Sequence, residues 1–355
     1  MTTTTERPRT GPEAPPEAPP GARFPEIENY ITRRHFLVGG AATLLLAGCG
    51  GGKQTTGGDG ASGRKRTIEH KFGSAEVPET AKRVVTVGYN EADFALALGV
   101  VPVGVRDFIG PFREESRPWA REELDGADPK LVGGDEINFE AVAALEPDLI
   151  LGIYSFMTQD NYDLLAEIAP TVAQPARYED GATPWQEQML ITGRAFGMEA
   201  EAQRVVAQAE GRFENAREHH PEFDGQTAAV TFATEGELYV LEPTDLRTLL
   251  FTSLGFGLPD ETGTISRERI DVLDQDVLVF VGTDRETLED DELLQSLDAA
   301  REGRIVYFGD FSTDFAGALG YSSPLSLPFA LDLAVPRLAA AVDGDPQTGA
   351  TGVGS

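Results

Sequence analysis

The sequence has few of the residues that build disulfide frameworks and metal sites. Its 355 residues include one cysteine and four histidines, two of them adjacent at His219 and His220. A single cysteine excludes a disulfide framework, and so few histidines argue against a multi-histidine metal site. The 41% content of hydrophobic residues over this length is enough for two domains, each with its own core.

Positive charge is also scarce, because 29 lysines and arginines stand against 59 aspartates and glutamates. The formal net charge of −30 argues against nucleic acid or an anionic membrane surface as a partner. We interpret the excess of carboxylates as a solvated acidic surface.

Familiar catalytic motifs are absent as well. The chain contains neither the Gly-x-Ser-x-Gly elbow of hydrolases nor a phosphate-binding P-loop, and no histidine lies near a convincing serine or cysteine nucleophile. The 59 acidic residues leave open the hypothesis that two carboxylates act as catalytic acid and base, although no pair stands out. No catalytic residue is therefore assigned, and an enzyme without a recognisable motif is the less favoured alternative.

The N-terminus has the pattern of an export signal. The pair Arg33-Arg34 precedes the apolar run 38–47, which is too short for a stable membrane anchor. Together they are typical of a twin-arginine signal. Leu46-Ala47-Gly48-Cys49 resembles a bacterial lipobox, in which Cys49 becomes the lipidated first residue. The alternative is a buried cysteine that follows a weak signal peptide.

We predict that residues 1–48 are a twin-arginine-type lipoprotein signal peptide and that the Gly-rich residues 49–66 are a flexible tether. The mature protein would lie on the outer face of the cytoplasmic membrane, held by lipid on Cys49 and carrying no other covalent cofactor. The polar, Gly-rich residues 344–355 are predicted to be a disordered tail.

One long helical stretch, residues 185–220 with a break at Gly197, joins two halves of the chain that resemble each other. Apolar residues recur at helical spacing in its second part, and Pro221 ends it. Residues 138–151 and 266–279 each have the pattern of a short helix, a tight turn and a buried strand, which many helix–turn–strand units share. The matched pairs are Glu140 with Glu268, Val142 with Ile270, Leu145 with Leu273 and Asp148 with Asp276.

Strands alternate with helices on both sides of the joining segment. This alternation predicts an α/β fold of two similar lobes with mainly parallel sheets, joined by one long helix. We assign residues 67–184 to the N-terminal lobe, 185–220 to the joining helical segment and 221–343 to the C-terminal lobe.

Aromatic, arginine and hydroxyl side chains gather where the predicted strands end. Ligands of open α/β sheets bind beyond the carboxyl ends of the strands, and such a surface suits a bulky ligand with carbonyl or oxyanion oxygens. For any single residue, core packing or a surface ion pair is an equally good interpretation. The candidate ligand-binding residues are Tyr89, Asn90, Arg106, Phe108, Tyr154, Ser155, Trp185, Tyr239, Arg247 and Tyr321, and no metal-ligating residue is assigned.

Several motifs stand in a characteristic order through residues 67–342. They include Ala97-Leu-Gly-Val-Val-Pro-Val-Gly-Val105, Asn138-Phe-Glu140, Leu145-Glu-Pro-Asp-Leu-Ile150, Ile168-Ala-Pro-Thr-Val172 and Leu319-Gly-Tyr-Ser-Ser-Pro324. With them the chain resembles the siderophore-binding lipoproteins of iron ABC importers, within the wider family of receptors for ferric siderophores, haem and cobalamin.

The resemblance implies a monomeric two-lobed receptor that captures a ferric siderophore and delivers it to an ABC permease with its ATPase. It also implies that Glu140 and Glu268, one on each lobe, dock to arginines of the permease subunits. Their alternative role is to favour a helix N-terminus after the N-caps Asn138 and Ser266.

No histidine stands among the candidate residues at the strand ends, so the siderophore is expected to supply every ligand to iron. A receptor for cobalamin or haem is the alternative, although haem would call for an axial histidine or tyrosine. The acidic composition favours hydroxamate or mixed-ligand chelates over strongly anionic catecholates. The siderophore itself is not assigned.

Overall fold

The computed structural model describes residues 65–107, 112, 117–234 and 237–343. These residues all belong to one compact unit. The predicted signal peptide, Cys49, the tether up to residue 64, Phe108 and the predicted tail lie outside the described residues.

The N-terminal lobe is built on a five-stranded parallel sheet with the order β5-β4-β3-β6-β7. Its helices follow the strands in alternation, as predicted, while an antiparallel hairpin at its start was not predicted. The hairpin consists of β1 (Arg66–His70) and β2 (Gly73–Val77). The strands are β3 (Val84–Thr86), β4 (Gly104–Val105), β5 (Lys130–Leu131), β6 (Leu149–Gly152) and β7 (Thr171–Ala173), and the helices are α1 (Glu91–Leu96), α2 (Arg121–Leu124), α3 (Phe139–Ala144) and α4 (Gln159–Ile168).

The C-terminal lobe has a mixed sheet with the order β10-β9-β8-β11-β12. Its strands β8 (Ala228–Thr234), β11 (Val277–Gly282) and β12 (Ile305–Asp310) are parallel, whereas β9 (Glu237–Val240) and β10 (Gly263–Ile265) are antiparallel additions at one edge. The remaining elements are η3 (Pro221–Phe223), η4 (Leu246–Thr248), α7 (Leu249–Ser253), η5 (Arg267–Leu273), α8 (Arg285–Leu288), α9 (Glu292–Gln295), α10 (Asp298–Arg301), α11 (Asp314–Tyr321) and α12 (Ser326–Val342).

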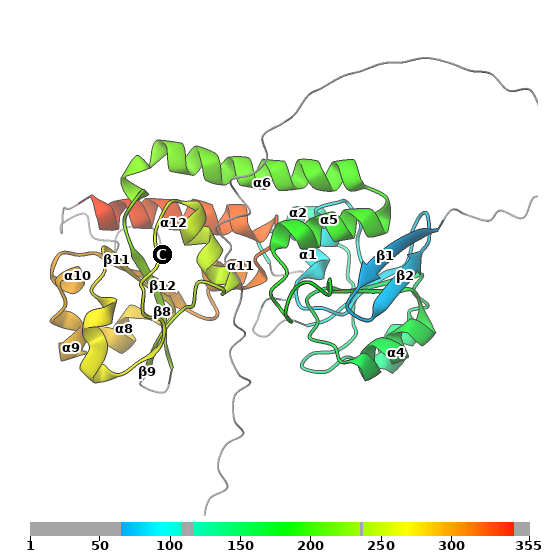
Figure 1. Cartoon of the computed structure of the whole chain (residues 1–355), viewed down its shortest axis with the longest axis horizontal. Coiled ribbons are helices and arrows are strands. Elements are labelled where there is room, and N and C mark those ends of the chain that lie inside the picture. The colour runs from blue at the N-terminus through cyan, green and yellow to red at the C-terminus, as the bar shows by residue number, and fades with distance from the viewer. Residues whose placement is uncertain (1–64, 108–111, 113–116, 235–236, 344–355) are drawn as a thin grey trace, which may run out of the picture. The chain divides into compact units, whose positions relative to one another are not determined.

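Two helices form the predicted joining segment. The first, α5 (Trp185–Phe196), ends at Gly197, whose φ of 71° is a left-handed conformation that glycine adopts without strain. The second, α6 (Glu199–His219), is the long green helix of Figure 1 and stops before Pro221. It packs on α5 of one lobe and on α12 of the other, and its buried side chains follow the predicted spacing.

The hydrophobic core continues from one lobe into the other on the side of α5, α6 and α12. Its largest cluster contains residues from both sheets, such as Leu149 and Val279. The opposite face of each sheet has a separate, smaller cluster. The near-continuous apolar strands β6 and β11 are therefore covered on both faces, which is typical of parallel strands.

The internal repeat is confirmed in its strands and differs in its helices. Asn138 caps α3 by accepting a hydrogen bond from the backbone nitrogen of Ala141 at 3.0 Å. The matching segment η5 is a 3₁₀ helix with a bend at Arg269, and Ser266 makes no side-chain capping bond there. The predicted N-cap position of Ser266 is confirmed, with an extended backbone at φ −67° and ψ 152°, but its side chain does not cap the helix.

The aspartates of the repeat hold the amino ends of the sheets together. Asp148 precedes β6 and accepts hydrogen bonds from the backbone nitrogens of Lys82 at 2.8 Å and Arg83 at 2.9 Å, next to β3. Asp276 precedes β11 and accepts one from Thr227 at 2.8 Å, next to β8. Each carboxylate thus satisfies backbone donors where the neighbouring strand begins, and the repeated acidic position is structural.

Candidate functional site

Three aromatic rings form a cluster beyond the carboxyl ends of β3 and β6. The ring centroids of Tyr154 and Phe156 lie 5.2 Å apart, and those of Tyr89 and Phe156 lie 6.1 Å apart. Phe156 is 49% exposed and has a φ of 54°, a left-handed conformation that is costly for a bulky residue. An exposed ring held in a strained turn is typical of a binding surface.

A buried carboxylate, that of Glu91, bonds to the backbone of this N-terminal aromatic cluster. Glu91 has no exposed surface, and its Oε1 accepts a hydrogen bond from the backbone nitrogen of Tyr154. A Cβ atom on Gly88 would clash with this carboxylate, so a larger residue there would require the Glu91 side chain to move. Burial raises the pKa of Glu91 to about 7, against the lowering influence of backbone donors and Arg106.

Arg106 follows β4 and spends all five of its N–H groups inside the lobe. Nε and Nη2 donate to the carbonyl oxygens of Gly134 and Asp135, and Nη1 donates to those of Val87 and Ser155. The remaining Nη2 proton goes to the Tyr89 hydroxyl at 2.8 Å, and the guanidinium lies 4.1 Å above the centroid of that ring. Arg106 therefore organises the loops around the cluster and has no N–H group to spare in this conformation.

A second set of three rings lies in the C-terminal lobe. The centroids of Phe232 in β8 and Tyr239 in β9 are 5.1 Å apart, and Phe311, just after β12, lies 6.0 Å from Phe232. Phe311 is 50% exposed. This C-terminal aromatic cluster matches the first one in its place at the end of the sheet, but it has two phenylalanines and one tyrosine where the first has two tyrosines and one phenylalanine.

Arg247 in η4 accompanies the C-terminal aromatic cluster. Asp245 grips one edge of its guanidinium: Nε donates to Oδ1 at 2.9 Å and Nη2 to Oδ2 at 2.6 Å. The guanidinium carbon lies 5.7 Å from the ring centroid of Phe232. Among the described residues, the Nη1 group has no hydrogen-bond partner, so this edge of the side chain is available to a ligand.

Electrostatic coupling links the two aromatic clusters. Burial raises the pKa of Tyr154 to about 12, the Asp245 carboxylate of the other lobe adds to the rise, and Arg247 opposes it. At neutral pH the phenol of Tyr154 is therefore neutral and can donate a hydrogen bond.

The structure brings five of the predicted ligand-binding residues into this region: Tyr89, Arg106, Tyr154, Tyr239 and Arg247. Ser155 lies beside them, but its hydroxyl donates to the carbonyl of Gly152 at 2.8 Å and closes the turn.

The other described candidates are buried. Trp185 is 4% exposed and packs in the main core, and Asn90 donates through Nδ2 to the carbonyl of Tyr321 at 3.0 Å between the lobes. Burial favours packing roles for these three residues, and their contact with a ligand stays a prediction. Phe108 lies outside the described residues.

Sequence reasoning missed a buried polar network between the lobes. Asp93 in α1 accepts from Trp119 Nε1 at 2.9 Å and from Ser323 Oγ at 2.7 Å, and its other oxygen lies 3.0 Å from Arg117 Nη2. Arg117 also donates through Nη1 to the Tyr321 hydroxyl at 2.9 Å. Breaking such a buried ion pair is costly. The network thus joins the lobes at a second place besides α6.

The two predicted docking residues are exposed on different lobes. Glu140 lies in the first turn of α3 and Glu268 in the first turn of η5. Among the described residues, neither carboxylate has an ion-pair partner. Both remain available for an external cation, and their docking role stays a prediction.

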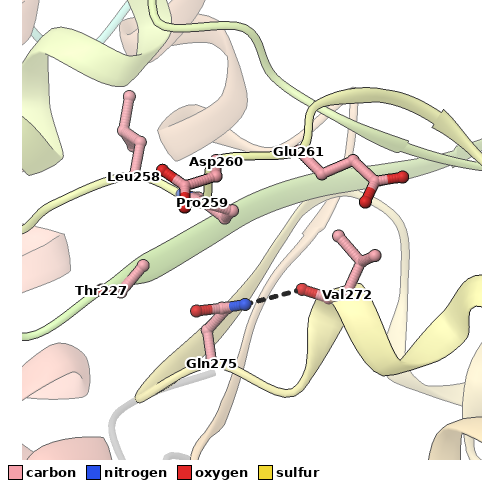
Figure 2. Close-up of a pocket in the computed structure, with 7 residues that line it drawn as sticks. All are labelled: Thr227, Leu258, Pro259, Asp260, Glu261, Val272 and Gln275. Carbon is pink, nitrogen blue, oxygen red and sulfur yellow. Dashed lines mark hydrogen bonds between the residues drawn. The ribbon is translucent and has the colours of Figure 1, made fainter.

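The hollow of Figure 2 lies elsewhere. It has a volume of about 290 Å³ and is lined by Thr227, Leu258, Pro259, Asp260, Glu261, Val272 and Gln275. Thr227 precedes β8 and Gln275 precedes β11, so the hollow opens at the amino ends of these strands. It is therefore separate from the aromatic clusters at the carboxyl ends.

The part of the chain that the structure describes has neither a membrane-spanning helix nor a cluster of metal-ligating side chains. No helix there is long and apolar enough to span a bilayer. No group of three or more His, Cys, Asp or Glu side chains in the same ranges is placed to hold a metal ion.

Comparison with known proteins places these features in context. Residues 84–310 match the family model described as periplasmic binding protein. Among curated proteins, the probable siderophore-binding lipoprotein YfiY of Bacillus subtilis is 27% identical over 258 residues, which cover 67% of this chain and 75% of the relative. The iron(3+)-hydroxamate-binding protein YxeB of the same species is 24% identical and covers 79% of this chain and 91% of its own.

Solved structures that are similar to this chain include two binding proteins. A periplasmic solute binding protein from Mycobacterium smegmatis is 34% identical with a TM-score of 0.73, over 78% of this chain and 99% of that one. PiaA of Streptococcus pneumoniae, solved in complex with ferrichrome, is 27% identical with a TM-score of 0.67, over 79% of this chain and 99% of that one.

Proposed function

The chain belongs to the periplasmic binding protein family, and from this premise we propose that it is an extracytoplasmic receptor that captures a ferric siderophore and delivers it to an ABC permease. The observation that carries the proposal is the pair of aromatic clusters, one in each lobe, with the partly exposed guanidinium of Arg247 beside the ring of Phe232. Relatives named for siderophore and ferric hydroxamate binding support the same ligand class.

The chemistry of the clusters fits such a ligand. Aromatic faces give apolar contact area to the backbone of a chelate, while the Arg247 edge and the Tyr154 hydroxyl donate to its oxygens. The siderophore would supply the ligands to iron: neither cluster contains a histidine, and the phenol of Tyr154, with a pKa of about 12, stays protonated at neutral pH. The protein then binds and transfers its cargo without changing it, which is the role of a receptor and not of an enzyme.

Two further parts of the proposal concern the receptor's surroundings. Lipid on Cys49 would hold the receptor at the outer face of the cytoplasmic membrane, as the lipobox pattern indicates. Glu140 and Glu268 would bind cations on the two permease subunits, and their exposure on separate lobes supports that role. The receptor would work as a monomer.

Titration of intrinsic fluorescence tests the ligand class. Ferric hydroxamates, ferric catecholates, haem and cobalamin are each added to the mature protein, with Trp119 and Trp185 as reporters. We expect saturable quenching below micromolar concentrations with a ferric chelate. Saturable binding of haem or cobalamin alone, or of none of the four, would contradict the proposal.

Variants then locate the site. Phe156→Ala and Phe311→Ala remove one exposed ring from each cluster, and each should weaken binding by about tenfold, since a buried aromatic contact contributes on the order of 1 kcal/mol or more. Leu293→Ala is the matched control, because Leu293 is a large apolar side chain of similar exposure (42%) on α9. An equal loss in all three variants would argue against the clusters as the site.

A further inference from the structure

The two arginines at the aromatic clusters differ in what they can offer a ligand. Arg106 lies over Tyr89 and donates all five of its N–H groups inside the lobe. Arg247 keeps a free edge, and Asp245 holds its other edge with N–O distances of 2.9 and 2.6 Å. The guanidinium that can contact a ligand is thus paired with a carboxylate.

This balance matters because ferric chelates differ greatly in charge. Three hydroxamate groups neutralise Fe(III), whereas three catecholates, each doubly charged, leave the complex trianionic. A site for a trianion needs uncompensated cations close to the ligand, since one unit charge at van der Waals distance from another is worth about 4 kcal/mol even at an effective dielectric constant of 20. Here the carboxylate of Asp245 offsets the one guanidinium that has a free edge.

The geometry of the pair gives Asp245 this influence. Its two oxygens take the Nε and Nη2 side of the guanidinium, and Oδ1 also accepts the backbone nitrogen of Arg247 at 2.9 Å. The side chain of Arg247 is therefore fixed with Nη1 free. Asp245 both orients the arginine and places a negative charge beside any ligand atom that Nη1 contacts.

We propose that Asp245 is a specificity-determining residue: by orienting and neutralising Arg247, it makes the site select a near-neutral ferric chelate of the trihydroxamate type and disfavour trianionic tris-catecholates. The inference rests on the proposed function and deepens it by naming the chelate class.

A charge series at this pair tests the inference. Asp245→Asn leaves the arginine uncompensated, and Arg247→Gln leaves the aspartate uncompensated. Affinities are measured for ferrichrome, a neutral trihydroxamate, and for a hexadentate Fe(III) tris-catecholate. The ratio of tris-catecholate affinity to ferrichrome affinity should rise on the order of tenfold in Asp245→Asn and fall in Arg247→Gln, while wild type prefers ferrichrome.

Asp291→Asn is the matched control. Asp291 holds Arg267 in the same two-pronged manner, with both N–O distances at 2.7 Å, and its replacement changes the net charge of the protein equally. This variant should leave the affinity ratio unchanged. A similar rise in Asp291→Asn would assign the effect to overall charge and overturn the role of Asp245.

The remaining outcomes are also decisive. A wild-type preference for the tris-catecholate, or a ratio that does not move in either pair variant, would overturn the inference and leave the receptor function standing. Wild-type protein that binds neither probe nor any other ferric chelate would overturn the proposed function itself. If Asp245→Asn does not fold, as judged by circular dichroism, the fall expected in Arg247→Gln carries the test alone.

Discussion

The two lobes carry the same kinds of side chain at the ends of their strands but use the arginine differently. In the N-terminal lobe, Arg106 is buried and donates to four carbonyl oxygens and one hydroxyl. In the C-terminal lobe, Arg247 is partly exposed, and one aspartate holds a single edge of it. An arginine that follows a strand is thus a loop organiser in one lobe and a candidate ligand contact in the other.

The repeated acidic positions differ in the same instructive way. Asp148 and Asp276 accept backbone hydrogen bonds and are structural. Glu140 and Glu268 lie on the same repeat units but are exposed. A repeated acidic residue can therefore be assigned a role only when its partners within the fold are known.

The largest expected effect concerns the exposed pair. Glu140→Ala combined with Glu268→Ala should abolish uptake of the ferric siderophore in cells, because both docking carboxylates are lost, while affinity for the ligand in solution stays unchanged. The measurements are iron uptake in a strain that depends on this receptor and a binding titration of the purified variant.

A matched pair separates docking from an effect on helix N-termini. Glu122 and Glu292 are also exposed glutamates in first turns, of α2 in one lobe and α9 in the other. Their double alanine variant should transport normally. Normal uptake by the Glu140/Glu268 variant, or an equal loss in the Glu122/Glu292 variant, would refute the docking role.

The arginine comparison predicts a large difference in stability. Arg106→Gln should lower the free energy of unfolding by about 3–5 kcal/mol, because buried carbonyl oxygens lose their donors and Glu91 loses a nearby cation. Arg247→Gln should change it by less than about 1 kcal/mol, as is usual for partly exposed ion pairs. Urea unfolding followed by fluorescence and circular dichroism measures both, and equal losses would invalidate the distinction between the lobes.

Much of the fold could be predicted because its signals are local. The apolar runs of β6 and β11, the break at Gly197 and the stop at Pro221 each fall within a few residues of sequence. The antiparallel edge strands β9 and β10 were not predicted as such, since direction depends on which neighbour a strand pairs with.

The site was less predictable because the partners of its residues are distant in the chain or have no recognisable sequence pattern. Arg106 bonds to backbone carbonyls, which every residue possesses, so the sequence alone cannot distinguish it from Arg247. The network of Asp93, Arg117 and Tyr321 joins residues more than two hundred positions apart. The partners of Tyr239 and Arg247 in the C-terminal cluster, Phe232 and Asp245, were also missed, although Asp245 stands only two residues before Arg247.

The carboxylates behind the two clusters offer a further comparison, in which pH is the variable. Glu91 is fully buried under the N-terminal cluster with a pKa of about 7, whereas Asp245 is partly exposed and paired with Arg247. Since the folded-state pKa of Glu91 is above its ordinary value of 4.5, the folded protein favours the protonated form. The resulting contribution to stability is complete below the ordinary pKa and is lost as pH rises through about 7.

Glu91→Gln isolates this contribution, because glutamine keeps an oxygen for the Tyr154 N–H group but does not titrate. Between pH 5 and pH 8 the free energy of unfolding of wild type should fall by about 3 kcal/mol relative to the variant, from the shift between 4.5 and about 7 at 1.36 kcal/mol per pKa unit. His70, whose pKa is lowered by burial, contributes the opposite slope in both proteins and cancels in the difference. Parallel pH profiles for the two proteins would show that Glu91 is already charged in the folded state, and the buried support of Tyr154 would then be an ionic one.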